Sequence, residues 1–464
     1  MKQRSTAPAK RHLIGIGGVG MSALATALVK LGDTVTGADR TLGTPNIRFL
    51  ESLGVKVFPD DGSGIDAATD EVIVSTAIEE ANPGLRKARE LGIPVTHRAK
   101  ALARTLAGHR LVAVVGTCGK STVTAMLGHV LAECGLDPLC VNGANVPGWD
   151  GAVRFGRGEY AVAEVDESDK SLVAFSPYAA IVTNASADHY SKEEMDAVFD
   201  AFVKDCKGPV VDGRKIFNHG LARINTDCRE VSHGFARINT DLGTGDQSVK
   251  IRDNSWLNLE GLEVPIPGVH NRQNAELAVR MAIALGVKPS EAIAAMKTFR
   301  GVERRLQLIT PPKPPEPSKL PKPSKPPKPP EPPEPAVYDD YAHNPEKLKA
   351  MWTTLAEKYP QGICAIWRPH GYAPLRKMKD ALAAMFAETI RPQDRLLLLP
   401  VYDAGGTTDR SINSDALIAT VAQTNAAAGA RVELVAGLDA AFDWCAAHCG
   451  VFGCFVTCGA RDPG

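Results

Sequence analysis

Short apolar runs that end in glycine-rich loops divide this chain into strand–loop–helix units. Residues 12–16 lead into a loop at residues 15–20, and residues 111–115 lead into a second loop at residues 116–122. Both runs are short and apolar, which is typical of a strand buried in a parallel sheet. A helix is predicted over residues 21–31, directly after the first loop. The pattern therefore predicts an α/β fold.

The same alternation continues along the chain. Strands are predicted at residues 160–163 and 180–183 in the middle, and near the end at residues 336–338, 362–367, 396–401 and 452–456. Helices at residues 345–358 and 378–390 separate some of the later strands. The last third is thus predicted to be a further α/β unit.

One segment differs in composition from the rest. Residues 311–335 hold 14 of the chain's 33 prolines, so this segment cannot bury a core and is predicted to be an extended polyproline II linker. A length of 464 residues predicts about three domains. We expect them at 1–107, 108–310 and 336–464, with the linker at 311–335. A nonapeptide occurs in two nearly identical copies, at residues 219–227 and 233–241, and this region is predicted to be a surface insertion.

Charge and apolar content exclude several classes of protein. The 53 basic residues equal the 53 acidic ones, which argues against a general nucleic-acid or anionic-membrane binder. The apolar runs are all too short for a membrane helix, and residues 1–11 do not have the pattern of a secretory signal. The ten cysteines are then predicted to be reduced thiols of a cytoplasmic protein.

The first loop has the pattern of a nucleotide-binding turn. Gly15, Gly17, Gly18 and Gly20 follow a strand and precede a helix, where backbone N–H groups bind phosphate, and Asp39 follows the next strand. By itself this pattern also fits an NAD-dependent oxidoreductase or a tight glycine turn.

The second loop is more specific. It places a lysine and a hydroxyl after glycines at a strand–helix junction. Its residues are Gly116, Thr117, Cys118, Gly119, Lys120, Ser121 and Thr122. Such a loop binds a triphosphate, with Lys120 on the β- and γ-phosphates and Ser121 on Mg²⁺. The strict pattern has glycine where this chain has Val114, so the loop is a shorter form.

Acidic residues and a histidine follow the next strands. Residues 164–169 include Glu164, Asp166 and Asp169, and Asp188 and His189 follow a later strand. Carboxylates and imidazole at strand ends suit a Mg²⁺ site beside a γ-phosphate.

In this order the motifs resemble the Mur ligase family over nearly the whole chain. The matching segments are residues 15–22 with 38–39, 75–78 with 82–83, 116–122, 164–169, 183–184 with 188–189, 268–271 with Asn274, Gly301 with Arg304 and Arg305, 339–345, 368–370, and 401–402 with 404–405.

The resemblance implies three domains: an N-terminal Rossmann-like domain that binds a UDP-sugar, a central P-loop ATPase domain, and a C-terminal Rossmann-like domain that closes over ATP. It implies that residues 116–122 and His270, Asn271, Asn274, Arg305 and Asp340 bind ATP. It implies that Mg²⁺ is held by Ser121, Glu164 and His189. The catalytic residues would be Lys120, Glu164, His189, Arg305 and His343. Substrates would be bound by Gly15, Gly17, Gly18, Gly20, Met21, Ser22, Asp39, Ser75, Arg368 and His370.

The implied reaction is ATP-dependent amide-bond formation. A carboxylate of a UDP-N-acetylmuramate-type substrate becomes an acyl phosphate, which the amine of a small amino acid attacks; L-alanine is the first expectation. The protein is expected to be a monomer or weak dimer, with no nucleic-acid or membrane partner.

Departures from the family pattern leave alternatives open. They are Cys118 in the phosphate loop, residues 184–188, and residues 402–409. Family members usually continue past residue 464, so a shortened C-terminal domain is one hypothesis. A ligase for another acceptor or peptide, and a catalytically weak nucleotide-binding paralogue, are the alternatives. A cluster near the end of the chain contains Cys445, His448, Cys449, Cys454 and Cys458. We interpret its cysteines as small buried thiols in preference to a zinc site.

Overall fold

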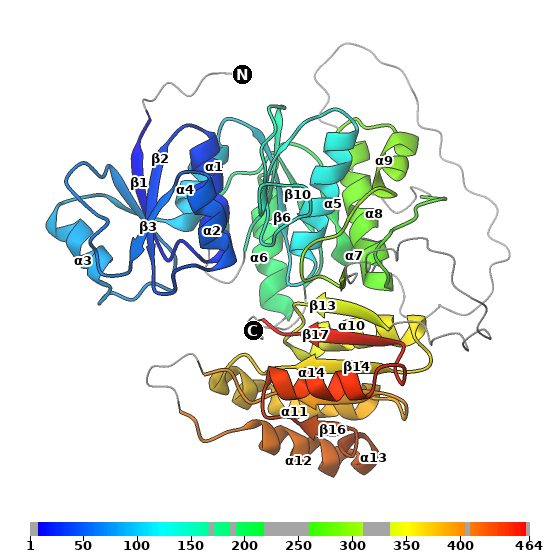
Figure 1. The fold of residues 1–464 in the computed structure, drawn as a ribbon. Coiled ribbons are helices and arrows are strands. Elements are labelled where there is room, and N and C mark those ends of the chain that lie inside the picture. Colours follow the sequence, from blue (N-terminus) through cyan, green and yellow to red (C-terminus); the bar gives the residue numbers. More distant parts are fainter. Residues whose placement is uncertain are drawn as a thin grey trace, which may run out of the picture. The chain divides into compact units, whose positions relative to one another are not determined.

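A computed structural model describes residues 8–166, 171–185, 192–217, 259–309, 335–403 and 409–460. The predicted linker (except Pro335), the duplicated nonapeptide, and the predicted site residues Asp169, Asp188 and His189 lie outside these ranges. Contacts divide the chain into two compact units, Met1–Pro265 with Gln273–Arg300, and Ile266–Arg272 with Gly301–Gly464. The first unit contains two mainly parallel sheets and the second contains one, all flanked by helices, so the predicted α/β class is confirmed (Figure 1).

The first unit begins with a five-stranded parallel sheet of order β3-β2-β1-β4-β5. Its elements are β1 (Lys10–Ile14), α1 (Val19–Lys30), β2 (Thr34–Asp39), α2 (Pro45–Ser52), β3 (Lys56–Pro59), β4 (Glu71–Val74), α3 (Pro83–Glu90), β5 (Val95–His97) and α4 (Arg98–Leu106). The ends of β1, β2 and β4 lie at one edge of the sheet, which brings the first glycine loop, Asp39 and Ser75 to that edge.

A six-stranded sheet of order β11-β10-β6-β9-β7-β8 follows in the same unit, parallel except for the β7–β8 pair. Its elements are β6 (Arg110–Val115), α5 (Lys120–Glu133), β7 (Leu139–Val141), β8 (Val153–Arg154), β9 (Tyr160–Glu164), the 3-10 helix η1 (Ser171–Ala174), β10 (Ala179–Val182), α6 (Lys192–Lys204), β11 (Val210–Asp212), α7 (Gly213–Phe217), α8 (Val269–Ala284) and α9 (Pro289–Met296). One hydrophobic core includes residues of both sheets and of the helices packed on them, among them Leu13 in β1, Ala113 in β6, Leu24 in α1 and Phe199 in α6.

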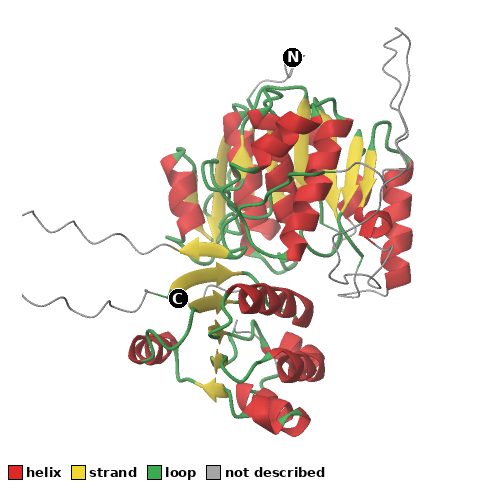
Figure 2. Cartoon of the chain, turned by 90° about the vertical axis from the view of Figure 1, so that its right-hand side faces the viewer, coloured by secondary structure: helices red, strands yellow, loops and turns green. Residues whose placement is uncertain are grey.

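The second unit is built on a sheet of order β12-β13-β17-β14-β15-β16, with helices on both faces (Figure 2). Its elements are β12 (Gln307–Ile309), β13 (Ala336–Asp340), α10 (Pro345–Lys358), β14 (Ile363–Trp367), α11 (Tyr372–Thr389), β15 (Arg395–Leu398), α12 (Ser414–Thr424), α13 (Ala426–Gly429), β16 (Val432–Leu434), α14 (Leu438–Ala447) and β17 (Cys454–Cys458). Only β12 runs antiparallel, and it pairs Ile309 with Val337 across the segment 310–334.

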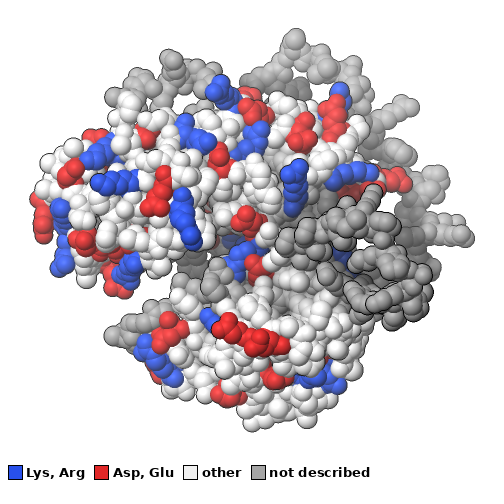
Figure 3. Space-filling view, in the orientation of Figure 1, with Lys and Arg blue, Asp and Glu red and all other residues white. Residues whose placement is uncertain are grey.

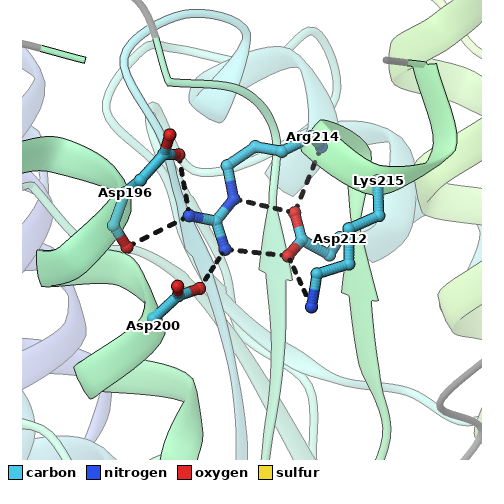
Figure 4. A network of polar contacts seen from close by, with 5 residues as sticks. All are labelled: Asp196, Asp200, Asp212, Arg214 and Lys215. Carbon is cyan, nitrogen blue, oxygen red and sulfur yellow. Dashed lines mark hydrogen bonds and ion pairs between the residues drawn. The ribbon is translucent and has the colours of Figure 1, made fainter. Parts of the chain in front are cut away.

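A buried ionic network joins α6 to the end of β11 (Figure 4). The guanidinium of Arg214 donates two parallel hydrogen bonds to Asp212, at 2.9 and 2.8 Å, and further bonds to Asp196 at 2.9 Å and Asp200 at 2.6 Å. Both Arg214 and Asp212 have side chains only 8% exposed. These carboxylates raise the pKa of Arg214 against the effect of its burial.

The surface carries charges of both signs. Lysines and arginines are interspersed with aspartates and glutamates over the face in Figure 3. In the part of the chain that the structure describes, no helix has the length and apolar character needed to cross a membrane.

Candidate functional site

The phosphate loop at residues 116–122 joins β6 to α5. Gly116 has φ 130° and Gly119, the N-cap of α5, has φ 81°. Only glycine adopts such angles readily, and a Cβ at Gly116 would collide with the Thr183 hydroxyl. A Cβ at Gly119 would lie 2.6 Å from Asn274 Oδ1. The two glycines therefore let the loop turn tightly, and Asn274 lies beside it.

Lys120 lies across this loop. Its ammonium donates to the Gly116 carbonyl at 2.6 Å and lies 3.8 Å from the carboxylate of Asp166. The side chain is only 11% exposed, so the positive charge is held at the helix N-terminus, where an anionic ligand is also favoured by the helix dipole.

Two side chains with oxygen atoms lie at this edge of the sheet. Glu164 ends β9 and accepts a hydrogen bond from the N–H of Gly143 at 2.8 Å, while Ser121 is buried in the first turn of α5. Among the described residues, no group of three or more His, Cys, Asp and Glu could hold a metal ion. A hydroxyl with one or two carboxylates still fits Mg²⁺, because that ion takes its remaining ligands from phosphates and water.

The first glycine loop is organised around Asp39. The N–H groups of Gly17 and Thr41 donate to its carboxylate at 2.9 and 3.0 Å. Met21 and Ser22 are buried, and the Ser22 hydroxyl donates to the Val19 carbonyl of its own helix. The structure therefore brings Asp39 to the loop, and gives it a role in holding the loop's backbone.

Two residues at this loop were missed by the sequence analysis. Asn46 donates to the Gly17 carbonyl at 2.9 Å, and the Arg98 guanidinium lies close enough to Gly20 that an added Cβ would be 3.1 Å from it. Arg98 is the first residue of α4, so this contact depends on how α4 packs against α1. A spacing pattern along the chain does not contain that information.

The second unit gathers the later candidates at the ends of β13 and β14. The carboxylate of Asp340 accepts from the N–H groups of Leu306 at 2.7 Å and Ala342 at 2.8 Å. Burial raises the pKa of Asp340 to about 6, and the positive charge of Arg305 opposes the rise. Arg305 lies over the ring of Tyr341, 4.9 Å from its centroid.

Two histidines face each other in the same unit. The rings of His343 and His370 are 5.1 Å apart at 78°, and His343 Nδ1 bonds to the Tyr341 carbonyl at 2.8 Å. Burial and the charge of Lys347 lower the pKa of His343 to about 4, so its ring is neutral at pH 7. Arg368 follows β14 and buries its Nε, which has no hydrogen-bond partner among the described residues.

His270 and Asn271 lie at the start of α8. Burial lowers the pKa of His270, and the Asn271 amide donates to the Pro267 carbonyl at 2.7 Å. Each unit thus brings together its own share of the predicted residues. Asn274 lies beside the phosphate loop in the first unit. In the second unit Arg305 and His343 contact Tyr341, Asp340 precedes it in the chain, and His370 faces His343.

Fold and phosphate loop define an α/β protein of the nucleotide-binding class. Three family models match the chain: "Mur ligase family, catalytic domain" at residues 10–110, "Mur ligase middle domain" at 114–282, and "Mur ligase, glutamate ligase domain" at 330–461.

Relatives of similar sequence belong to the same family. A UDP-N-acetylmuramate–L-alanine ligase of Paenarthrobacter aurescens is 35% identical over 85% of this chain and 83% of its own. One of Methylobacterium radiotolerans is 32% identical over 92% and 91%. The chain belongs to the Mur ligase family, whose members are ATP-dependent ligases that form carbon–nitrogen bonds.

Solved structures show the same fold. A UDP-N-acetylmuramate–alanine ligase of Thermotoga maritima matches with a TM-score of 0.71 at 24% identity, covering 98% of this chain and 96% of its own. A murein peptide ligase of Psychrobacter arcticus matches with a TM-score of 0.62 at 20% identity, over 97% and 96%. The family and fold inferred from the motifs are confirmed.

Proposed function

We propose that this chain joins L-alanine to the carboxylate of UDP-N-acetylmuramate at the expense of ATP, through an acyl phosphate. The observation that carries the proposal is the phosphate loop with Lys120 folded across it, in a chain 35% identical to a ligase of that name over 85% of its length. The alternative function, that of an NAD-dependent oxidoreductase, is supported only by the pattern of the first glycine loop.

Each glycine loop is assigned one phosphate-bearing ligand. The phosphate loop, with Lys120, takes the triphosphate of ATP; Ser121 and Glu164, with His189, would hold Mg²⁺, which supplies charge neutralisation at the transferred phosphoryl group. The first loop takes the diphosphate of the UDP-sugar, and the positive charge of Arg98 beside Gly20 supports this.

The second unit is assigned the closing and amino-acid-binding roles. Arg305 is a fixed cation suited to the γ-phosphate. His343 is neutral at pH 7 and its Nδ1 is bonded to the Tyr341 carbonyl, so its Nε2 is a hydrogen-bond acceptor for a substrate group. Arg368 can bind the carboxylate of the amino acid, beside His370. We propose three domains, for which the sequence predicts the limits 1–107, 108–310 and 336–464, and the three family matches support this division. Residues 301–309, which include β12, belong to the second unit together with 336–464.

Phosphate release by the purified protein tests the proposal. With ATP and Mg²⁺, release should require both UDP-N-acetylmuramate and an amino acid, tested as L-alanine, glycine and L-serine. Lys120→Ala should lower kcat by about 100-fold, because one preorganised charge is lost from the transferred group. Lys288→Ala removes a lysine that is 77% exposed and is the matched control.

The outcomes separate the alternatives. Release with glycine or L-serine in place of L-alanine would reassign the amino acid. ATP binding without release under any combination would favour a different acceptor or a catalytically weak paralogue. Equal kcat for Lys120→Ala and Lys288→Ala would refute the assignment of the phosphate loop.

A further inference from the structure

The residues after β10 lie directly beside the phosphate loop. Strands β6 and β10 are parallel neighbours, and Val115 pairs with Val182 at their ends. Residues 116–118 and residues 183–184 therefore leave the sheet side by side at the same edge. The close approach of Gly116 to Thr183 and Asn184, where an added Cβ would find three atoms within 3.0 Å, is the result.

Asn184 is bonded to the loop through its whole amide group. Its Oδ1 accepts from the Thr117 hydroxyl at 2.7 Å and from the Cys118 N–H at 2.9 Å, and its Nδ2 donates to the Cys118 carbonyl at 3.0 Å. The Thr183 hydroxyl donates to the same carbonyl at 2.6 Å. Both polar groups of the Cys118 backbone are thus fixed by residues that follow a different strand.

Only an amide satisfies this arrangement at the position of Asn184. The loop presents two donors to one atom and an acceptor to the other, so a carboxylate could take the first two bonds but not the third. Asn184 was not among the site residues predicted from the sequence.

We propose that Asn184 is a positioning residue that holds the phosphate loop in its nucleotide-binding shape before the nucleotide arrives. It fixes Thr117 and Cys118, and the first intrahelical hydrogen bond of α5, from Val123 N–H to Gly119 C=O, begins immediately after them. With the loop already ordered, ATP binding does not have to supply that free energy.

The thiol of Cys118 reports the state of the loop. Iodoacetamide labelling with peptide mapping, without nucleotide, should show Cys118 of Asn184→Ala reacting about tenfold faster than in the wild-type chain, because three hydrogen bonds are removed. Cys206, half-buried in the same unit, should react at the wild-type rate and serves as the internal control.

Further variants keep the result interpretable. Asn184→Asp retains two of the three bonds and Thr117→Val removes only one, so both should label at intermediate rates. Asn82→Ala removes a buried asparagine elsewhere in the unit, which caps α3 and donates to Asp60, and should leave Cys118 labelling unchanged. Melting temperatures of all variants show whether each is folded.

A kinetic measurement completes the test and rests on the proposed ATP site. A loop that is less ordered lowers the fraction of binding-competent protein, so Asn184→Ala should raise KM for ATP about tenfold with kcat at saturating ATP within about twofold. Unchanged Cys118 labelling in a folded Asn184→Ala variant would overturn the proposal. Faster labelling without ATP turnover in the wild-type chain would instead refute the proposed function.

Discussion

Removal of Arg214 should open the α6–β11 region locally. In Arg214→Ala the carboxylate of Asp212 stays buried, with only Lys215, 3.7 Å away, as its remaining ion-pair partner among the residues described. Loss of one partner from a buried ion pair costs about 3–5 kcal/mol. Asp200 is 62% exposed, so its share is within about 1 kcal/mol. We therefore expect a loss of about 3 kcal/mol.

Hydrogen exchange with mass spectrometry is the suitable assay. A chain of several domains has no single free energy of unfolding, whereas exchange reports local opening. A loss of about 3 kcal/mol corresponds to roughly 100-fold faster exchange, at about 1.4 kcal/mol per tenfold change. The effect should appear in peptides from residues 192–217, and not in those from β13 or β14.

Two variants test the reasoning behind that number. Asp200→Asn removes the exposed partner and should speed exchange by less than about tenfold. Arg214→Ala combined with Asp212→Asn removes the uncompensated charge and should be more protected than Arg214→Ala alone. If Arg214→Ala and Asp200→Asn accelerate exchange equally, or the double variant recovers nothing, buried charge is not the cause.

Three further predictions concern the two units. Gly116→Ala should weaken ATP binding at least 100-fold in a nucleotide titration, since its Cβ would strike Thr183; binding at the wild-type level would contradict the loop geometry. Arg98→Ala should raise KM for the UDP-sugar about tenfold and leave KM for ATP unchanged, as a charge-assisted hydrogen bond is lost; steady-state kinetics checks both values. Asp340 keeps its proton up to about pH 6 in the folded state but loses it near 3.8 when unfolded, so it destabilises the fold progressively as the pH rises from about 4 to 6 and by a constant amount above. In peptides from β13, the protection of Asp340→Asn against hydrogen exchange, relative to wild type at the same pH, should rise over that interval and then level off; a difference independent of pH would show that the pKa is not raised.

Local signals predicted most elements well. The predicted helix at 345–358 is α10, because Asn344 caps it and Pro345 occupies its first turn. The predicted helix at 378–390 begins six residues earlier, at Tyr372, because Pro374 lies in the first turn of α11, where proline is tolerated. The strand expected at 396–401 ends at Leu398, two residues before Pro400.

The candidate site was predictable where one motif holds it together. Residues 116–122 contain their own glycines, lysine and hydroxyl, so the phosphate loop could be inferred without a fold. Arg98 and the contacts of Asn184 could not, because each depends on which strands are neighbours and how helices pack on them. A place in a motif does not by itself show a binding role. Ser22 belongs to the first motif, yet its hydroxyl donates to the Val19 carbonyl of its own helix.

The register of β12 and β13 has a consequence for the proline-rich segment that the sequence analysis predicts to be a linker. Ile309 and Val337 are paired partners across adjacent strands, so the segment between them starts and finishes at one edge of one sheet. Paired residues of neighbouring strands are about 5 Å apart, so the chain leaves this strand pair and returns to it at nearly the same place. Residues 310–334 are therefore a suitable site for a replacement. A shorter turn, or a reporter domain whose ends lie close together, can be inserted there with the strands of the sheet left in place.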